Sequence, residues 1–151
     1  MNLLKYSNTI EKQIHGNSDL YIDSILKKIQ GKLRDIAIRS EITNNTLRFK
    51  KDVNNYNRAE ALKTLRKGQF RINKINSNKI EIFWEVELDT LLFLSITIGL
   101  VLGLILSLFV GSGGFMIISS IIIGLAISTI AYLFGLNFIL TTIDEIIETS
   151  I

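Results

Sequence analysis

From Thr90 to Gly111 the sequence reads TLLFLSITIGLVLGLILSLFVG, twenty-two residues without a charge. At 1.5 Å per residue a helix of this length spans about 33 Å, enough to cross the roughly 30 Å hydrocarbon core of a bilayer. A second uncharged run covers residues 115–140. As a helix it would span about 39 Å, so it either tilts or continues beyond the interface. The sequence therefore predicts two transmembrane helices, over 90–111 and 115–140.

A short glycine-rich segment separates the two runs. Residues 112–114 read SGG and directly follow Gly111. Because glycine tolerates the left-handed backbone conformations that tight turns need, we expect a turn here. The two spans would then form an antiparallel helical hairpin. One continuous helix through both runs is the poorer alternative.

The distribution of basic residues favours the cytoplasm for both ends of the chain. All 17 Lys and Arg lie between Lys5 and Lys79, and cytoplasmic segments beside transmembrane helices carry an excess of these residues. The N-terminus has no apolar stretch long enough for a signal peptide. A small cytoplasmic domain joined to a helical hairpin is a plan found in many bacterial membrane proteins. We therefore expect a multi-pass protein of the inner cell membrane with both termini cytoplasmic.

Small residues recur along both predicted spans at spacings that place them on one helix face. Such stripes let helix backbones approach closely. We expect them to pack the two helices of one hairpin together. Contact with a neighbouring copy is the alternative, which a second small face at Ala131 and Gly135 favours. The predicted helix-packing or oligomer face consists of Ser95, Gly99, Gly103, Ser107, Gly111, Ser120, Gly124 and Ser128.

Residues 1–89 predict a small domain that precedes the spans. Ser18 is a candidate N-cap for a long helix, because its side chain can accept a hydrogen bond from the first helical turn. Gly31 is a candidate for the end of this helix. Apolar residues recur along it at helical spacing. They are Ile22, Ile25, Leu26, Ile29 and Leu33.

A second, shorter helix is predicted over residues 58–67. Asn57 and Glu60, three residues apart, resemble a capping box at its start. Gly68 is suited to the position that follows a helix end, where a left-handed backbone is common.

Alternation with a period of two predicts strands in the rest of the domain, most clearly over residues 80–88. Trp84 falls on the apolar face of that strand, so we expect it in the core, with an interfacial anchor as the alternative. Weaker alternation occurs near residues 4–6, 36–38, 47–50 and 70–73, with turn signals at 44–45 and 76–78. The predicted class is an α+β N-terminal domain followed by a two-helix transmembrane hairpin. Its mainly antiparallel sheet would have four to five strands, with one long and one short helix.

Charge is divided along the chain. Residues 1–80 hold 17 basic and 7 acidic residues, whereas residues 81–151 hold 7 acidic and none that are basic. We expect the outward carboxylates of residues 81–87 to pair across strands. The basic excess favours anionic lipid or another partner at the membrane surface, with a merely solvated surface and, less favoured, nucleic acid as alternatives. The candidate face consists of Arg48, Lys50, Lys51, Arg66, Lys67 and Arg71.

Residues 141–151 predict an acidic amphipathic helical tail. Isoleucines continue one stripe from the second span, and carboxylates occupy the other side. Acidic groups at a helix C-terminus oppose the helix dipole, so a compensating contact is needed. We expect contact with the basic domain or with a neighbouring copy. The candidate contact residues are Asp144, Glu145 and Glu148.

Signatures of catalysis are missing from the sequence. The chain has no Cys and one His, His15, which we expect at the surface or in a turn. It has no P-loop, dinucleotide-binding or HExxH motif. We therefore expect no catalytic residues, no cofactor and no metal. The sequence favours a non-enzymatic membrane protein whose cytoplasmic domain binds a partner or anionic lipid, as a subunit, accessory or homo-oligomeric scaffold of a membrane assembly. The alternative is an oligomeric transport or pore-forming protein built from the hairpin.

Overall fold

The computed structural model describes residues 4–14, 18–35, 38–51, 67–109 and 114–151. The chain divides into two compact units. The first contains residues 1–88 together with 142–151, and the second contains residues 89–141.

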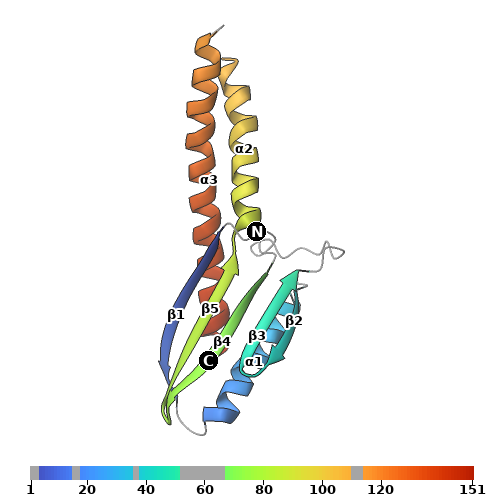
Figure 1. Cartoon of the computed structure of the whole chain (residues 1–151), viewed down its shortest axis with the longest axis vertical. Helices are drawn as coiled ribbons and strands as arrows, with labels where there is room; N and C mark the ends of the chain where they lie inside the picture. Colours follow the sequence, from blue (N-terminus) through green and yellow to red (C-terminus); the bar gives the residue numbers. More distant parts are fainter. Residues whose placement is uncertain (1–3, 15–17, 36–37, 52–66, 110–113) are drawn as a thin grey trace. The chain divides into compact units, whose positions relative to one another are not determined.

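The first unit is built on a five-stranded antiparallel sheet (Figure 1). Its strands are β1 (Lys5–Gln13), β2 (Ile38–Thr43), β3 (Thr46–Lys51), β4 (Lys67–Asn76) and β5 (Lys79–Glu87). They lie in the order β1-β5-β4-β3-β2, so β2 to β5 form a meander and β1 pairs with the free side of β5. The helix α1 (Ser18–Asp35) connects β1 to β2, which are the two edges of the sheet. The predicted α+β class and antiparallel sheet are confirmed.

The turn between β2 and β3 follows from its two asparagines. Asn44 and Asn45 have φ values of 46° and 58°. Asparagine tolerates this left-handed region better than most residues, and two such residues in succession suit the twist of a two-residue hairpin. The flanking residues Thr43 and Thr46 are therefore paired.

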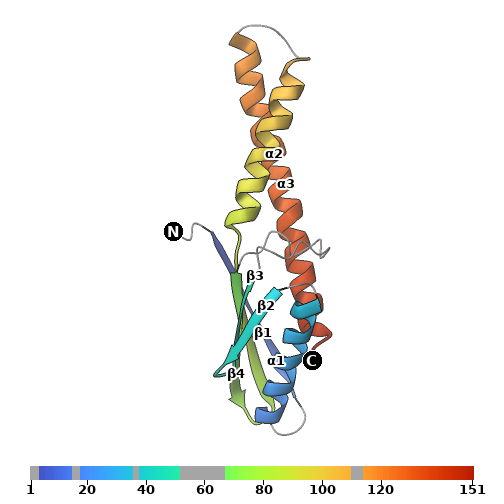
Figure 2. The ribbon, with the colours of Figure 1, turned by 90° about the vertical axis from the view of Figure 1, so that its right-hand side faces the viewer.

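One face of the sheet packs against α1 and forms the core (Figure 2). Trp84 is only 1% exposed, and its ring lies 5.5 Å from that of Tyr6. The predictions of a core tryptophan and of an apolar face on β5 are confirmed. The predicted apolar stripe of α1 is also buried, but the helix continues past Gly31 to Asp35, so this glycine does not end it.

The last residues of the chain belong to the same unit, beside α1 (Figure 2). The hydroxyl of Tyr21 donates a hydrogen bond to the carbonyl oxygen of Ile151 at 3.0 Å. Nζ of Lys32 donates to the hydroxyl of Thr149. The buried tail residues are Ile143, Ile146, Ile147 and Ser150. The tail therefore contributes side chains to the apolar interior of a domain whose other elements lie in residues 1–88.

The predicted short helix over 58–67 falls mostly on residues 52–66, outside the described residues. Lys67 and Gly68, its expected last residue and the residue after it, lie instead in β4. Close packing explains this glycine. A Cβ at Gly68 would lie 2.6 Å from the carbonyl oxygen of Glu85 and would overlap the ring of Phe49. The His15 prediction also lies outside the described residues.

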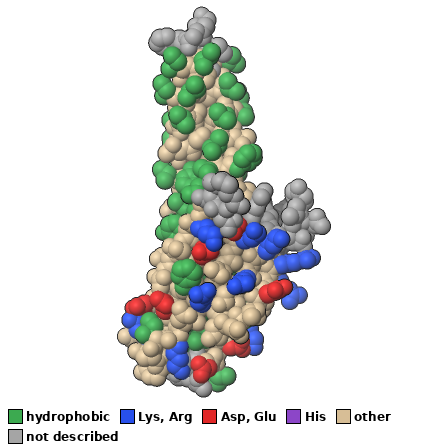
Figure 3. All heavy atoms as spheres, in the orientation of Figure 1, with side chains coloured by type: hydrophobic (Ala, Val, Ile, Leu, Met, Phe, Trp, Pro, Cys, Tyr) green, Lys and Arg blue, Asp and Glu red, His purple; other side chains and the backbone are tan. Residues whose placement is uncertain are grey.

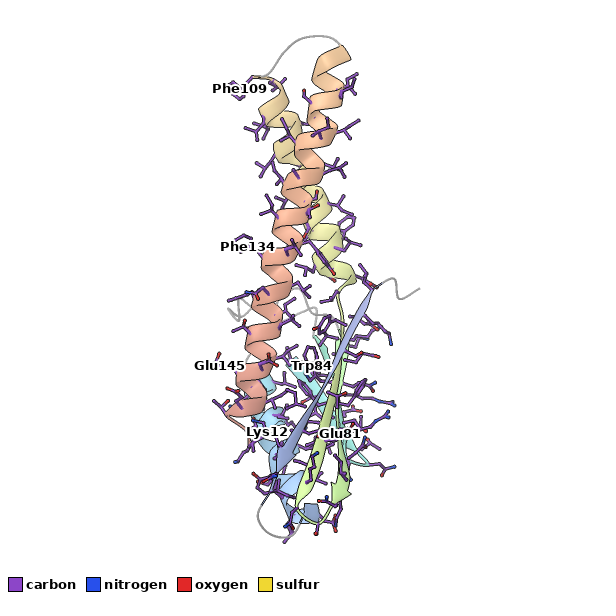
Figure 4. All side chains as sticks on the ribbon, turned by 90° about the vertical axis from the view of Figure 1, so that its left-hand side faces the viewer. Lys12, Glu81, Trp84, Phe109, Phe134 and Glu145 are labelled. Carbon is purple, nitrogen blue, oxygen red and sulfur yellow. The ribbon has the colours of Figure 1, made fainter. Side chains whose placement is uncertain are left out.

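The second unit contains α2 (Asp89–Ser107) and α3 (Gly114–Glu148) as far as residue 141. By length and composition, both helices are apolar and long enough to cross a membrane. Their large apolar side chains are mostly exposed, with Phe93 at 73% and Phe134 at 75% (Figure 4).

Two glycine substitutions test the packing of the first unit. Gly68→Ala is expected to destabilise the domain by about 1–3 kcal/mol, because the added Cβ overpacks against Phe49 and β5. Gly31→Ala is the matched control, because its Cβ would meet nothing within 4 Å. Alanine is more favourable than glycine in a helix interior by about 1 kcal/mol, so this variant is expected to be as stable as the unsubstituted chain or more stable. The measurement is a urea unfolding midpoint of the full chain in detergent, followed by the fluorescence of Trp84. A destabilised Gly31→Ala or an unaffected Gly68→Ala would contradict this packing.

Candidate functional surfaces

The face of the sheet opposite α1, called here the outer face, carries four cations and one carboxylate in a row at one end. Pairing of the five strands places Arg39, Lys50, Lys67, Glu87 and Lys5 next to one another across β2, β3, β4, β5 and β1. We call these five residues the exit row. Glu87 ends β5, and α2 begins two residues later at Asp89. The exit row therefore lies at the end of the sheet from which the chain leaves for α2.

The carboxylates of β5 pair with its two neighbours, as expected for this face. Nζ of Lys5 lies 2.8 Å from Oε1 of Glu85, and Nζ of Lys67 lies 3.7 Å from Oε2 of Glu87. The hydrogen bond to Glu85 and the nearby charges of Glu85 and Glu87 outweigh partial desolvation and hold the pKa of Lys5 above its ordinary value. A raised lysine pKa stabilises the fold at neutral pH, and this contribution is lost as the pH rises through the folded-state pKa.

The side of the outer face formed by β3 and β4 is less well neutralised (Figure 3). Arg48, Lys50 and Arg71 are exposed and form no ion pair with any carboxylate that the structure describes. Lys50 lies directly opposite Lys67 in the strand register, and Arg39 lies opposite Lys50 on its other side. Like charges directly opposite each other destabilise a sheet.

The predicted basic residues are partly brought together. Lys50 and Lys67 enter the exit row, whereas Arg48 and Arg71 lie further along the outer face. Arg66 and the side chain of Lys51 lie outside the described residues. Sequence reasoning missed Lys5 and Arg39. They join the row only through the pairing of β1 with β5 and of β2 with β3. Extending the alternation near residue 38 by one residue is the signal that could have placed Arg39 on the outer face.

The tail carries its carboxylates on the side away from its buried isoleucines. Asp144, Glu145 and Glu148 are all exposed (Figure 4). The contacts of the tail within the first unit are made by the apolar side and by the hydrogen bonds to Tyr21 and Lys32.

The small-residue stripes of α2 and α3 face each other within one chain. A Cβ at Gly99 would overlap the hydroxyl of Ser128, and one at Gly103 would lie 2.7 Å from the carbonyl oxygen of Ser120 and 2.8 Å from Cα of Gly124. Ser95 is also buried. The side chain of Ser107 and all of Gly111 lie outside what the structure describes.

Gly135, from the second small face of α3, also contacts α2. A Cβ at Gly135 would overlap the side chain of Leu91. Gly103 lies beside Gly124, and Leu91 lies beside Gly135, so the two helices are antiparallel. In each contact the two residue numbers sum to about 226, which gives the register of α2 against α3. Asp89, the first residue of α2, is therefore level with roughly Asn137, and α3 runs on past this level to Glu148.

Within the described ranges, no three His, Cys, Asp or Glu side chains form a group that could hold a metal ion. Comparisons with protein-family models, with curated proteins and with solved structures found no match.

Truncation of one tail side chain tests the role of the tail in the core. Ile147 is fully buried, so Ile147→Ala is expected to lower the unfolding free energy of the domain by about 2–5 kcal/mol. The exposed neighbour provides the control, since Glu148→Ala is expected to change it by less than about 0.5 kcal/mol. Urea unfolding of the full chain, followed by Trp84 fluorescence, measures both. Equal midpoints for the two variants would show that the tail does not support the domain.

Proposed function

We propose that this chain is a non-enzymatic membrane protein with two spans, both termini cytoplasmic, whose α+β domain is a binding module at the surface of the inner cell membrane. It would serve as a subunit, accessory or scaffold of a membrane assembly. The observation that carries the proposal is the exposed apolar surface of α2 and α3.

The two helices pack through glycines and leave their large apolar side chains outside. Soluble monomers rarely expose contiguous apolar patches larger than a few hundred Å². Here such side chains occur along both helices (Figure 3), which lipid would solvate. Examples are Phe93, Leu100, Leu104, Leu125, Leu133 and Phe134.

The hydroxyls in these helices support the same placement. Those of Ser95, Thr97 and Thr129 donate to the backbone oxygens four residues earlier at 2.8, 2.9 and 2.9 Å. A hydroxyl paired within its own helix needs no water, so it is compatible with lipid. The pore-forming alternative would instead need these groups to line a path for water or ions.

Asp89 and Asn137 support one boundary of the hydrocarbon core at the same height on both helices. Both are polar residues at the ends of long apolar segments, and the helix register places them side by side. A span bounded there contains 19 residues of α2, or about 28 Å, close to the thickness of a hydrocarbon core.

Two short connections support a domain held at the membrane surface. Leu88 alone separates β5 from α2, and α3 continues without interruption into the tail of the first unit. Neither connection contains the flexible linker that would let the domain move far from the bilayer.

Single cysteines test this topology, since the natural chain has none. In intact bacterial cells a membrane-impermeant maleimide is expected to label Ser112→Cys, which lies between the helices. Ser77→Cys in the β4–β5 turn and Glu148→Cys near the end should react only after permeabilisation. The unsubstituted chain is the control for background labelling.

Labelling of Ser77→Cys from outside would reverse the proposed orientation. Accessibility of residues 77 and 112 from the same side would exclude the hairpin. Alkaline carbonate extraction tests insertion itself, because a chain with two spans stays in the membrane pellet whereas a peripheral protein is released.

A further inference from the structure

We propose that copies of this chain bind one another through opposite charges, with the acidic side of one tail on the outer sheet face of the next copy. The acidic side, called here the acidic tail face, consists of Asp144, Glu145 and Glu148. The surface that binds it, called here the cationic patch, consists of Arg48, Lys50 and Arg71. This inference rests on the proposed function and deepens it, because it names the partner and the residues of a scaffold contact.

Both groups of charges are exposed and lack ion pairs in the part of the chain that the structure describes. No described cation pairs with the acidic tail face, and no described carboxylate pairs with the cationic patch. Arg48 lies directly opposite Glu41 in the register of β2 and β3, yet the two side chains form no ion pair. The three cations and the three carboxylates are therefore available to a partner.

The acidic tail face is unfavourable for the helix that carries it. α3 ends at Glu148 and has no basic residue in its last turn. Carboxylates near a helix C-terminus oppose the helix dipole, and nearby cations relieve this cost. Lys32 reaches the tail, but its described partner there is the hydroxyl of Thr149 and not a carboxylate. A cationic surface from outside the chain would supply the compensation.

The two groups of charges lie on opposite sides of the first unit. The tail lies beside α1, on the side of the sheet that α1 covers, whereas the cationic patch belongs to the outer face. Figure 4 shows Glu145 pointing away from the sheet, on the side opposite to Glu81 of the outer face. The sheet therefore separates the two groups within one copy, and contact between them requires a second molecule.

The charges are spaced similarly on the two surfaces. Residues three and four apart on a helix have Cβ atoms about 5–6 Å apart, which is the spacing of Glu148 from the other two carboxylates. Alternate residues of a strand, such as Arg48 and Lys50, lie about 7 Å apart. Arg71 pairs with Thr46 and is therefore diagonal to Arg48, at about 7–8 Å. Long side chains span the small differences, so several ion pairs can form at once.

A second copy is favoured as the partner because every copy carries both surfaces. Contact between two different surfaces is heterologous, so it joins copies into a ring or a filament. A single exposed ion pair is weak. Confinement to one membrane raises the effective concentration of the copies, which favours a contact built from weak pairs. Nucleic acid or another acidic polymer would bind the cationic patch but leave the acidic tail face uncompensated.

Charge reversal tests the contact in the full chain. The tail variant is Glu145→Lys/Glu148→Lys, and the patch variant is Arg48→Glu/Arg71→Glu. The combined variant has all four substitutions and keeps the net charge of the unsubstituted chain. Each protein also carries Ser77→Cys in the exposed β4–β5 turn, labelled with a donor or an acceptor dye. Energy transfer between copies is measured in phosphatidylcholine liposomes at low salt and a fixed, low protein-to-lipid ratio.

We expect the tail variant and the patch variant, each alone, to show severalfold less energy transfer than the chain without charge reversal, because like charges then face each other. An equimolar mixture of the two variants should recover most of the transfer, and so should the combined variant. Added salt should reduce the transfer of every sample that associates. Recovery in the mixture also shows that both variants are folded, since a misfolded surface would not regain its partner.

Transfer no higher than random mixing for the chain without charge reversal, or equal transfer for it and both variants, would overturn the proposal. Loss without recovery in the mixture and in the combined variant would overturn it as well, because the two surfaces would then not be partners. Loss in the patch variant alone would exclude the tail as the occupant. These outcomes leave the proposed membrane location intact, whereas release by alkaline carbonate would overturn that location itself.

Discussion

The register of β5 is the constraint on which the first unit depends. β5 pairs with β1 on one side and β4 on the other, and its residues alternate between the core and the outer face. A slip of one residue would bring Glu85 into the core and expose Trp84, so burial of one face fixes the register. The same register determines which cations become neighbours on the outer face. The core and the exit row therefore share one physical cause.

The sequence predicts features that depend on local periodicity. Three such features are present in the structure: the strand of residues 80–88, the apolar stripe of α1 and the two long apolar helices. Each is defined by a pattern among residues that are close together in the sequence. The class of the first unit follows, because an alternating sheet face and an amphipathic helix must cover each other.

Features that depend on distant partners are less accessible to sequence reasoning. Gly68 follows a segment with helix-capping signals, but in β4 a side chain at this position is excluded by the ring of Phe49, nineteen residues earlier, and by the backbone of β5. Lys5 and Arg39 join the exit row through strand pairing that no local pattern encodes. The isoleucines of the tail predict a buried face, yet a helical stripe does not specify which surface it will contact, which is here the side of the sheet occupied by α1.

The position of the tail also orders the events of synthesis. Residues 142–151 complete the interior of a domain whose other elements end at Leu88, and both apolar helices are made between these two segments. On the ribosome, the sheet and α1 must therefore wait with an uncovered apolar surface until α2 and most of α3 have emerged. The domain can therefore complete its fold only after both apolar helices have been synthesised.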